Sequence, residues 1–401
     1  MTRGSAPRPG PPVITDDVYR QRFVVSYDYA VHFTRGVFDP ANATLAEALG
    51  GEGTTGTALV VVDDGLVGSR GNITGMIRDY AHAHADLVSL AADPMVVPGG
   101  ERAKNDPDLL ARLQREILAL GIDRHSYVVA VGGGAILDLV GYAAASSHRG
   151  VRHVRIPTTV LAQNDSGVGV KNGVNAFGSK NYLGAFAPPW AVINDADFLE
   201  LLDPCDRRSG IAEAIKVALI RDPDFFRWLE DHAAELAAFD PDASDHMIRR
   251  SAELHMHQIA RGGDPFELGS ARPLDFGHWA AHRLETLTGF RLRHGEAVAI
   301  GIALDSRYSV QAGLLAPGAE QRVCDLLDAI GLPTWHEALE RADADGEPAL
   351  LRGLADFREH LGGQLTVTLL EDLGVSVEVH QIDAEQVSHA IAWLGERSGR
   401  R

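Results

Sequence analysis

Short apolar runs that alternate with amphipathic stretches constrain the fold of this chain more than any other feature. The apolar runs are rich in β-branched residues and lie at Thr57–Asp63, Pro94–Val97, Tyr127–Val131 and Val154–Ile156. Amphipathic stretches such as Asp106–Leu120 separate them. Strands that are apolar throughout are buried on both faces, which is typical of a parallel sheet covered by helices. The first half therefore predicts a Rossmann-like α/β nucleotide domain.

The second half has a different pattern. From about Pro204 onward the chain carries long helical patterns, and its strand-like runs are a late pair at Leu365–Leu370 and Val375–Val379. A chain of 401 residues is too long for one ordinary core. We expect a disordered tail over residues 1–20, an α/β domain over 21–203 and a mostly helical domain over 204–401. The boundary falls near Leu202–Arg208, and the active site is expected in the cleft between the two domains.

Charge and composition exclude several classes of partner. The net charge is −18, from 37 basic and 55 acidic residues, so the chain should repel nucleic acid and anionic membranes. No apolar run approaches the ~20 residues that span a bilayer, and residues 1–12 lack the apolar core of a signal peptide. Two distant cysteines, Cys205 and Cys324, favour a reducing cytoplasm over a cysteine-built metal cage. An anionic substrate would need a local cluster of cations.

A glycine turn suggests a nucleotide site. Tyr127–Val131 leads directly into Gly132-Gly133-Gly134 and then into a helical stretch, Ala135–Ser147. Glycines let a backbone approach a pyrophosphate, and the helix that follows offers free N–H groups. A plain tight turn is the alternative. Asp138, one helical turn further on, could accept a hydrogen bond from a cofactor, or it could be a first-turn acid favoured by the helix dipole.

Two further segments strengthen the nucleotide interpretation. Pro98-Gly99-Gly100 precedes Glu101 and Lys104; Glu101 could hold a ribose hydroxyl, although an ordinary surface ion pair is the alternative. Thr158 and Thr159 follow another strand, at the carboxyl edge where α/β sheets bind ligands. Together the three segments predict a dinucleotide site.

A carboxylate and three histidines suggest a metal site. Glu213 and Lys216 are three residues apart on one helical face, where a solvated salt bridge is the ordinary interpretation. His278 and His282 are four apart on another helical face, and His294 follows. Histidines among apolar helix residues are costly to bury without partners. One glutamate with two histidines leaves coordination positions open, as in catalytic zinc sites.

These residues also carry a family resemblance. From about residue 57 to residue 375 the chain resembles, in order, the 3-dehydroquinate synthase superfamily, which contains dehydroquinate synthases and the sugar phosphate cyclases of cyclitol pathways. The matching motifs are Gly132-Gly133-Gly134 with Asp138, SHRG (Ser147–Gly150), PTTVLAQNDS (Pro157–Ser166), Lys171, Lys180-Asn181, AEAIK (Ala212–Lys216), FGHWAAH (Phe276–His282) and His294-Gly295-Glu296. The resemblance implies an NAD-binding first domain, a metal-binding helical second domain and a homodimer.

The resemblance also implies roles for single residues. The implied ligands of Zn²⁺, or of Co²⁺ in its place, are Glu213, His278 and His294. The implied catalytic residues are Lys171, Lys216, His282, Asp165 and Asn181. The implied contacts to phosphate and substrate hydroxyls include Arg149, Lys180 and Asn181. The implied cofactor contacts are Asp63, Glu101, Lys104, Gly133, Gly134, Asp138, Thr158 and Thr159. The lysines and the arginine supply the cation cluster that an anionic substrate requires.

The chain departs from dehydroquinate synthases where those enzymes hold a substrate carboxylate. His255 stands where the family has a lysine, Arg272 is displaced by one residue from the usual arginine, and Asp275 replaces an asparagine. An end of the pocket that loses a lysine and gains an acid is poor for a carboxylate and suits a hydroxymethyl group. Near the C-terminus, Arg358 or His360 could supply the phosphate contact of the family's lysine pair.

The expected substrate is therefore sedoheptulose 7-phosphate. DSGVGVKNGVN (Asp165–Asn175) and Pro265–His278 resemble the 2-epi-valiolone synthase branch. The implied reaction is transient oxidation by NAD, phosphate elimination, reduction and intramolecular aldol closure, which yields a cyclitol. The alternatives are 3-dehydroquinate synthase, 2-epi-5-epi-valiolone synthase, a metal-dependent polyol dehydrogenase and an inactive binding subunit.

Overall fold

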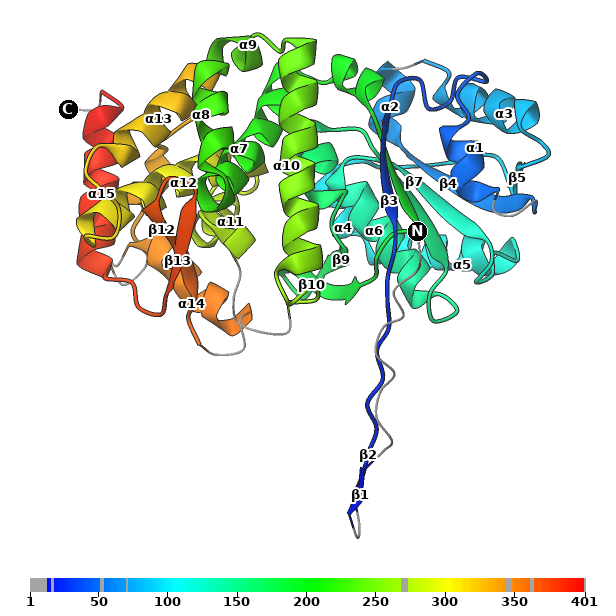
Figure 1. Cartoon of the computed structure of the whole chain (residues 1–401), viewed down its shortest axis with the longest axis horizontal. Helices are drawn as coiled ribbons and strands as arrows, with labels where there is room; N and C mark the ends of the chain where they lie inside the picture. The colour runs from blue at the N-terminus through cyan, green and yellow to red at the C-terminus, as the bar shows by residue number, and fades with distance from the viewer. Residues whose placement is uncertain are drawn as a thin grey trace.

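The computed structural model describes residues 13–15, 18–50, 54–69, 71–267, 273–343, 346, 348–360 and 364–399. It has two parts, a parallel sheet covered by helices and a mostly helical part that follows it (Figure 1). This is the fold class that the sequence predicts.

A twisted parallel sheet forms the first part. Its strands are β3 (Ala30–Thr34), β4 (Gly56–Asp63), β5 (Val88–Leu90), β6 (Met95–Val97), β7 (Tyr127–Gly132), β8 (Arg152–Pro157) and β11 (Ala191–Asp195). The strand order is β3-β11-β8-β7-β4-β5, and β6 also pairs with β4. Val62 lies opposite Val131, and Gly132 opposite Pro157, so these strands end at one edge. That edge carries the predicted cofactor residues.

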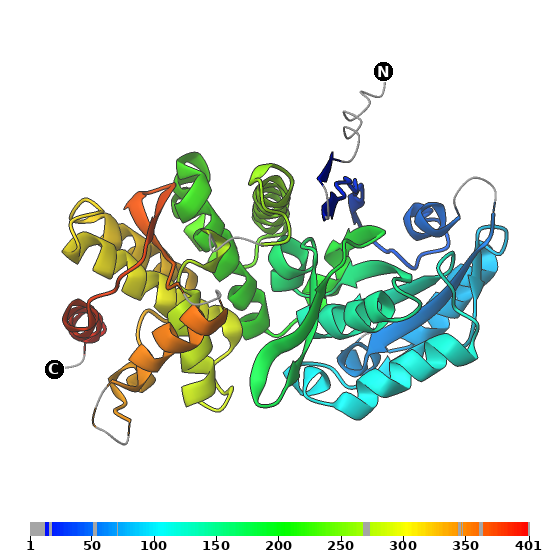
Figure 2. The ribbon, with the colours of Figure 1, turned by 90° about the horizontal axis from the view of Figure 1, so that it is seen from below.

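Helices cover both faces of the sheet, as Figure 2 shows. They are α1 (Thr44–Leu49), α2 (Asp64–Ser69), α3 (Ile73–Ala83), α4 (Glu101–Lys104), α5 (Pro107–Ala119) and α6 (Gly134–Ser146). Leu45, Ile77 and Tyr80 fill the core on one face. Leu113 and Ile136 belong to the core on the other face. Because the central strands β4 and β7 are buried between these two cores, most of their residues are apolar.

The second part packs long helices around its own apolar core. Its helices are α7 (Pro204–Arg221), α8 (Pro223–Asp231), α9 (Ala233–Ala237), α10 (Pro241–Arg261), α11 (His278–Leu287), α12 (His294–Gln311), α13 (Ala319–Ile330), α14 (Arg352–His360) and α15 (Ala384–Arg397). The antiparallel pair β12 (Val367–Asp372) and β13 (Val375–Val379) completes it. Buried residues of α7 and α12, such as Ile215 and Ile300, lie at the centre of this core. Within the described ranges, no helix is long and apolar enough to cross a bilayer.

Two hairpins extend from this frame. The strands β9 (Lys171–Ala176) and β10 (Ser179–Phe186) pair antiparallel and lie at the junction of the two parts (Figure 2). The strands β1 (Val13–Thr15) and β2 (Val18–Arg20) also pair, on an arm that projects from the body (Figure 1). A disordered tail was expected over residues 1–20, and the described part of it differs because β-prone valine and threonine residues allow strand pairing.

Candidate active site

The carboxyl ends of four strands form a glycine-lined cradle. Asp63 ends β4, and a Cβ on Gly99 would stand only 2.1 Å from its Oδ1 atom. A Cβ on Gly134 would lie 2.8 Å from Oγ of Ser166. A side chain at either position would displace Asp63 or Ser166, and glycine leaves the backbone open to a close ligand. The first-turn N–H groups of α6, which begins at Gly134, face this turn, as a pyrophosphate site needs.

The two threonines lie beside this cradle. Thr158 is buried, and its N–H group donates to the carbonyl of Gly132 at 3.1 Å. The Cγ2 atom of Thr159 lies 3.2 Å from the position of a Cβ on Gly133. The structure thus brings the predicted residues Asp63, Gly133, Gly134, Thr158 and Thr159 to one edge of the sheet.

Lys104 is a buried structural partner and not a surface residue. Its Nζ atom lies 2.7 Å from Oδ2 of Asp138 and also donates to the side-chain oxygen of Asn181. Glu101 accepts a hydrogen bond of 2.7 Å from Asn175. Surface ion pairing, the alternative interpretation of Glu101 and Lys104, is therefore wrong for Lys104. These contacts fasten the β9–β10 hairpin to the cradle.

A short π-helix, η2 (Ala162–Ser166), carries Asp165 toward the helical part. Gln163 donates to the carbonyls of Pro157 and Asp195, and Asn164 donates to the carbonyl of Gly210 at 2.7 Å. These buried amides hold the widened turn on both sides. π-Helical turns of this kind are frequent at functional sites.

The segment after this turn is held by Arg155, which the sequence analysis missed. Arg155 is fully buried in β8 and donates to the carbonyls of Gly167, Gly169 and Lys171. Its guanidinium also bonds to Oδ1 of Asn172 at 2.7 Å. Arg155 therefore fixes the backbone that carries Lys171. Arg155 stands between Val154 and Ile156 in this buried strand, and a charged residue between buried apolar neighbours was the signal that could have revealed it.

Glu213, His278 and His294 converge as a metal-ligand set would. Oε1 of Glu213 lies 3.7 Å from Nε2 of His278 and 3.5 Å from Nε2 of His294. One ligand atom from each residue lies within 4.8 Å of the others. Oε1 of Glu213 is buried and accepts no hydrogen bond from any described residue. An orphaned carboxylate oxygen facing two imidazole nitrogens fits a divalent cation such as zinc.

The other ring nitrogens of the two histidines are already engaged. Nδ1 of His278 lies 3.1 Å from the carbonyl oxygen of Phe276, so its Nε2 atom is the free one. Burial and the charge of Lys216 lower the pKa of His278, which favours the neutral imidazole that metals bind. Burial also lowers the pKa of His294, but Glu285 and Glu213 raise it by more than burial lowers it. The resulting pKa is about 9. The two carboxylates thus favour a positive charge beside His294, as a metal site requires.

Lys216 and Asp165 form a charged pair next to Glu213. The ammonium of Lys216 lies 2.5 Å from Oε2 of Glu213 and 3.9 Å from Oδ1 of Asp165. Burial lowers the pKa of Lys216, but the charges of Glu213 and Asp165 raise it above its ordinary value. Burial raises the pKa of Asp165, but Lys216 and His255 lower it more. Both groups are therefore held in their charged forms.

The remaining predicted site residues surround this centre. His255 on α10 reaches Asp165, with Nδ1 2.8 Å from Oδ1. Lys180 and Lys171 of the hairpin meet Glu285 and Glu267 of the helical part, at 3.0 and 2.6 Å. His282 also lies here, with its ring centroid 5.5 Å from that of His278, and the charge of Asp275 raises the pKa of Lys216.

Some predicted residues have no contact with the centre among the interactions of the described residues. Arg149 follows the C-terminal end of α6, about 20 Å along the helix from the glycine turn, and it is exposed. Arg358 is exposed on α14. Arg272 and the side chain of His360 lie outside the described residues.

Two further acids near the metal-ligand set were also missed by the sequence analysis. Glu285 is 5% exposed and contacts both Lys180 and His294. Asp305 on α12 accepts hydrogen bonds from the N–H group of Gly277 and the indole of Trp279, at 3.0 and 2.9 Å. These bonds fix the start of α11, where His278 lies. Glu285 lies three residues after His282 on the same helix face, a spacing that could have indicated it.

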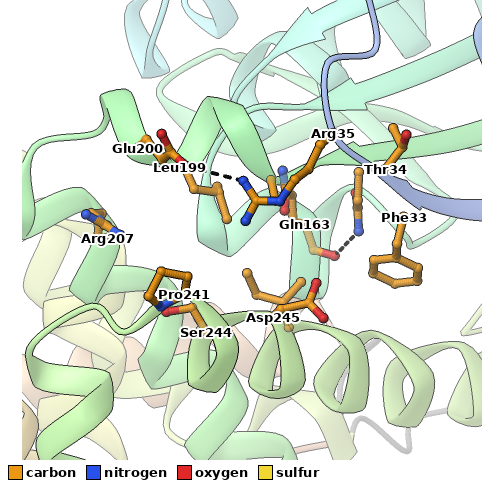
Figure 3. Close-up of a pocket in the computed structure, with 13 residues that line it drawn as sticks. Phe33, Thr34, Arg35, Gln163, Leu199, Glu200, Arg207, Pro241, Ser244 and Asp245 are labelled. Atoms are coloured by element: carbon orange, nitrogen blue, oxygen red, sulfur yellow. Dashed lines mark hydrogen bonds and ion pairs between the residues drawn. The ribbon is translucent and has the colours of Figure 1, made fainter. Parts of the chain in front are cut away.

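A small cavity lies at another part of the junction (Figure 3). Phe33, Arg35, Gln163, Arg207 and Asp245 are among its lining residues, and its volume is about 50 Å³. None of the candidate catalytic, cofactor or metal residues lines it. Its volume suits roughly one or two water molecules rather than a sugar phosphate.

A parallel sheet with a glycine cradle, joined to a helical part with a carboxylate–histidine set, defines the class of dehydroquinate synthase-like proteins. Residues 94–209 match the family model of the 3-dehydroquinate synthase N-terminal domain, and residues 210–347 match that of the C-terminal domain. The chain belongs to the 3-dehydroquinate synthase family, within the sugar phosphate cyclase superfamily.

Individual relatives agree with this assignment. A 3-dehydroquinate synthase of Rhodopseudomonas palustris (strain BisB18) is 38% identical over 77% of this chain and 81% of its own length. A 2-epi-5-epi-valiolone synthase of Streptomyces hygroscopicus subsp. jinggangensis 5008, solved with NAD⁺ and Zn²⁺, is 31% identical. Its TM-score is 0.83, over 94% of this chain and 99% of that one. A 2-deoxy-scyllo-inosose synthase, solved with carbaglucose-6-phosphate, NAD⁺ and Co²⁺, shares the fold at 22% identity and a TM-score of 0.73 over 90% and 95%.

Proposed function

We propose that this protein is a carbon–oxygen lyase that cyclises sedoheptulose 7-phosphate and releases phosphate, with 2-epi-valiolone as the product. The observation that carries the proposal is the contact between His255 and Asp165. An imidazole stands at the position where dehydroquinate synthases have a lysine, and its Nδ1 atom is engaged 2.8 Å from an acid. The nearby Asp275 adds a further negative charge. A substrate hydroxyl suits this end of the pocket better than a carboxylate does.

NAD and zinc fit the residues present. The glycine cradle with Asp63, Thr158 and Thr159 would hold NAD. Glu213, His278 and His294 would hold the metal, through Oε1 and two Nε2 atoms. When bound, NAD accepts a hydride and later returns it, and the metal polarises substrate oxygens as a Lewis acid.

The side chains around these sites account for the remaining steps. Lys180 and Lys171, on the hairpin, would neutralise the substrate phosphate before it leaves. Lys216 is held charged beside Glu213 and would stabilise the negative oxygen of the enolate. His282, which is exposed toward solvent, is placed to move protons during elimination and ring closure. Asp165 would accept a hydrogen bond from the reacting hydroxyl.

Dehydroquinate synthase is the second candidate, and sequence identity to named relatives supports it. Relatives with that activity in their names are 38–39% identical to this chain. The 31% identity to a 2-epi-5-epi-valiolone synthase supports a third candidate, in which the C7 cyclitol product is 2-epi-5-epi-valiolone. The pocket around His255 favours a sedoheptulose phosphate over the carboxylate-bearing substrate.

Parallel assays separate these candidates. Purified protein with NAD and zinc is incubated with sedoheptulose 7-phosphate or with the dehydroquinate precursor, and phosphate release, mass and NMR of the product are measured. A cyclic product from sedoheptulose 7-phosphate alone is expected, and NMR identifies the epimer. Turnover of the dehydroquinate precursor alone would reject the proposed substrate. Net NADH production would indicate a polyol dehydrogenase, and no product with either substrate would indicate a binding subunit.

We also propose that the protein acts as a homodimer in a reducing compartment such as the cytoplasm. The projecting arm exposes Phe23, Val24, Val25 and Tyr27, each by more than half. A second copy would cover apolar residues that are costly to expose on an arm. Cys205 and Cys324 are both free thiols. Sedimentation analysis of the full chain and of a variant without residues 1–25 tests the dimer; an unchanged molar mass would exclude the arm as its basis.

A further inference from the structure

Glu285 lies between two groups that belong to different parts of the molecule. Its Oε1 and Oε2 atoms each lie 3.0 Å from Nζ of Lys180, on the hairpin strand β10. Its Oε2 atom lies 3.3 Å from Nδ1 of His294, at the start of α12. The side chain of Glu285 is 6% exposed, so water contributes little to either contact. One buried carboxylate thus joins the hairpin to the metal-ligand set.

The contact with His294 decides which nitrogen of that ring can bind a metal. Nδ1 faces Glu285 and Nε2 faces Glu213, 3.5 Å away, so a proton on Nδ1 would be stabilised by Glu285 and leave Nε2 for a metal. Carboxylates that accept from the second nitrogen of a ligating histidine fix its tautomer and ring orientation. The corresponding nitrogen of His278, Nδ1, has a neutral partner instead of a carboxylate, namely the backbone carbonyl of Phe276. His294 has the charged partner, and its side chain is the more exposed of the two, at 28% against 10% for His278.

The contact with Lys180 adds a second consequence. The hairpin is tied to the sheet part through Asn181 and Lys104, and to the helical part also through Lys171 and Glu267. Its ion pair with Glu285 crosses to α11. An ammonium between two oxygens of one buried carboxylate is strongly held. Removing the carboxylate would therefore weaken the attachment of the hairpin to the helical part, where Lys171–Glu267 remains, and loosen the ring of His294 at the same time.

Another arrangement of the same residues is a metal bound by Glu285 itself. His282, Glu285 and His294 also form a group with ligand atoms within 4.8 Å. In that group the carboxylate of Glu285 is already neutralised by Lys180, whereas Oε1 of Glu213 is orphaned. Glu213 also has a counter-ion, Lys216 at its Oε2 atom, but its Oε1 atom faces the Nε2 atoms of both histidines. The geometry therefore favours Glu213 as ligand and Glu285 as its supporting acid.

We propose that Glu285 is a positioning residue that orients the metal ligand His294 and, through Lys180, joins the hairpin of the sheet part to the metal centre. This inference rests on the metal site of the proposed function but not on the identity of the sugar. The side chain of Glu285 would then fix the position of the substrate-binding Lys180 relative to the metal ligand His294.

Metal affinity measured without substrate tests the first half of this role. Zn²⁺ binding to the purified full chain is measured by competition with a chromophoric chelator, for the wild type, Glu285→Gln and Glu285→Asp. Loss of an acid that supports a ligating histidine typically weakens metal binding about 10- to 100-fold. We expect that loss for Glu285→Gln and partial recovery for Glu285→Asp. Glu320→Gln, which removes another buried carboxylate, paired with Arg307 at 2.9 Å, serves as the matched control.

Hydrogen exchange tests the second half. Amides of the hairpin, residues 171–186, should exchange faster in Glu285→Gln than in the wild type. Lys180→Met should produce the same faster exchange while keeping the metal affinity of the wild type, because it leaves Glu285 beside His294.

Three outcomes would overturn the inference. Unchanged metal affinity in Glu285→Gln would show that His294 needs no support, and complete loss of stoichiometric zinc would make Glu285 a direct ligand. Unchanged exchange of the hairpin would exclude the connection through Lys180. A wild type that binds zinc tightly but cyclises no sugar phosphate would instead reject the proposed function and leave this inference standing.

Discussion

Nδ1 of His255 lies 2.8 Å from Oδ1 of Asp165, and this contact joins the helical part to the sheet part of the molecule. Asp165 lies on the π-helical turn η2, and His255 lies on the long helix α10. Both side chains are mostly buried, at 21% and 13% exposure. The pair therefore sets the position of an acid that the proposed reaction uses, from a residue that distinguishes this chain from dehydroquinate synthases.

Replacing His255 should weaken catalysis through Asp165. Burial raises the pKa of Asp165, while Lys216 and His255 lower it, so removing His255 raises that pKa. The acid limb of the kcat/KM profile for His255→Ala should shift to higher pH, with turnover reduced roughly 10- to 100-fold. The exposed His257→Ala, two residues along α10, is the control. A wild-type profile for His255→Ala would contradict this role.

Removing Lys216 should destabilise the protein most when no metal is present. Lys216→Met leaves the carboxylates of Glu213 and Asp165 buried without their counter-ion. Breaking a buried ion pair typically costs about 3–5 kcal/mol, which lowers the thermal midpoint. Added Zn²⁺ should recover part of that loss, because the cation again neutralises Glu213. Lys171→Met, at a side chain that is 57% exposed, should change the midpoint little. Equal midpoints for both variants without zinc would argue against this ion pair.

Replacing His278 tests the metal ligands directly. His278→Ala removes one of the two Nε2 atoms that face Glu213, so bound zinc and turnover should both be lost. The helix should remain folded, because alanine is a good helix former. Metal content by elemental analysis, turnover and circular dichroism measure the three expectations. A fully active variant that retains its zinc would refute the assignment of His278.

The layout of the fold could be predicted from sequence because its strands are buried on both faces. The run Tyr127–Val131 was expected as a strand, and β7 spans Tyr127–Gly132. The stretch Asp106–Leu120 was expected as a helix, and α5 spans Pro107–Ala119. Burial on both faces leaves a continuous apolar run in the strand, and burial on one face leaves a helical period in α5. The β1–β2 pair could not be predicted, because three-residue strands leave no such period.

The site could be predicted only in part, because supporting residues act through contacts that are distant in sequence. Glu213 and His294 were recognisable as ligand types at familiar positions. Arg155 acts through backbone carbonyls, which carry no side-chain signal. Glu285 meets Lys180, 105 residues away, and no local pattern encodes that contact. Family motifs therefore identify groups that do chemistry better than groups that hold them in place.

Arg155 should control the order of the segment that carries Lys171. Arg155→Lys keeps the positive charge but cannot donate to all the carbonyls that the guanidinium reaches. Amides over residues 166–172 should exchange faster, and kcat should fall at least about 10-fold because Lys171 is displaced. Arg152→Lys, on the same strand but stacked on Trp190, is the matched control. Unchanged exchange over this segment would exclude the role.

Asp305 should make stability depend on pH in a predictable direction. Burial raises its pKa to about 7, although the hydrogen bonds from Trp279 and Gly277 lower it. The unfolded carboxyl titrates near pH 4, so between about pH 4 and 7 the folded state binds the additional proton. The contribution of Asp305 to stability is therefore largest at low pH, falls by up to about 1.4 kcal/mol per pH unit as pH rises, and levels off above 7.

Asp305→Asn cannot titrate, so its unfolding free energy relative to the wild type should rise across this window and then become constant. Denaturant titrations from about pH 6 to about pH 8 measure this difference. A constant difference from pH 6 upward would mean that Asp305 is already ionised there and that its two hydrogen bonds outweigh burial.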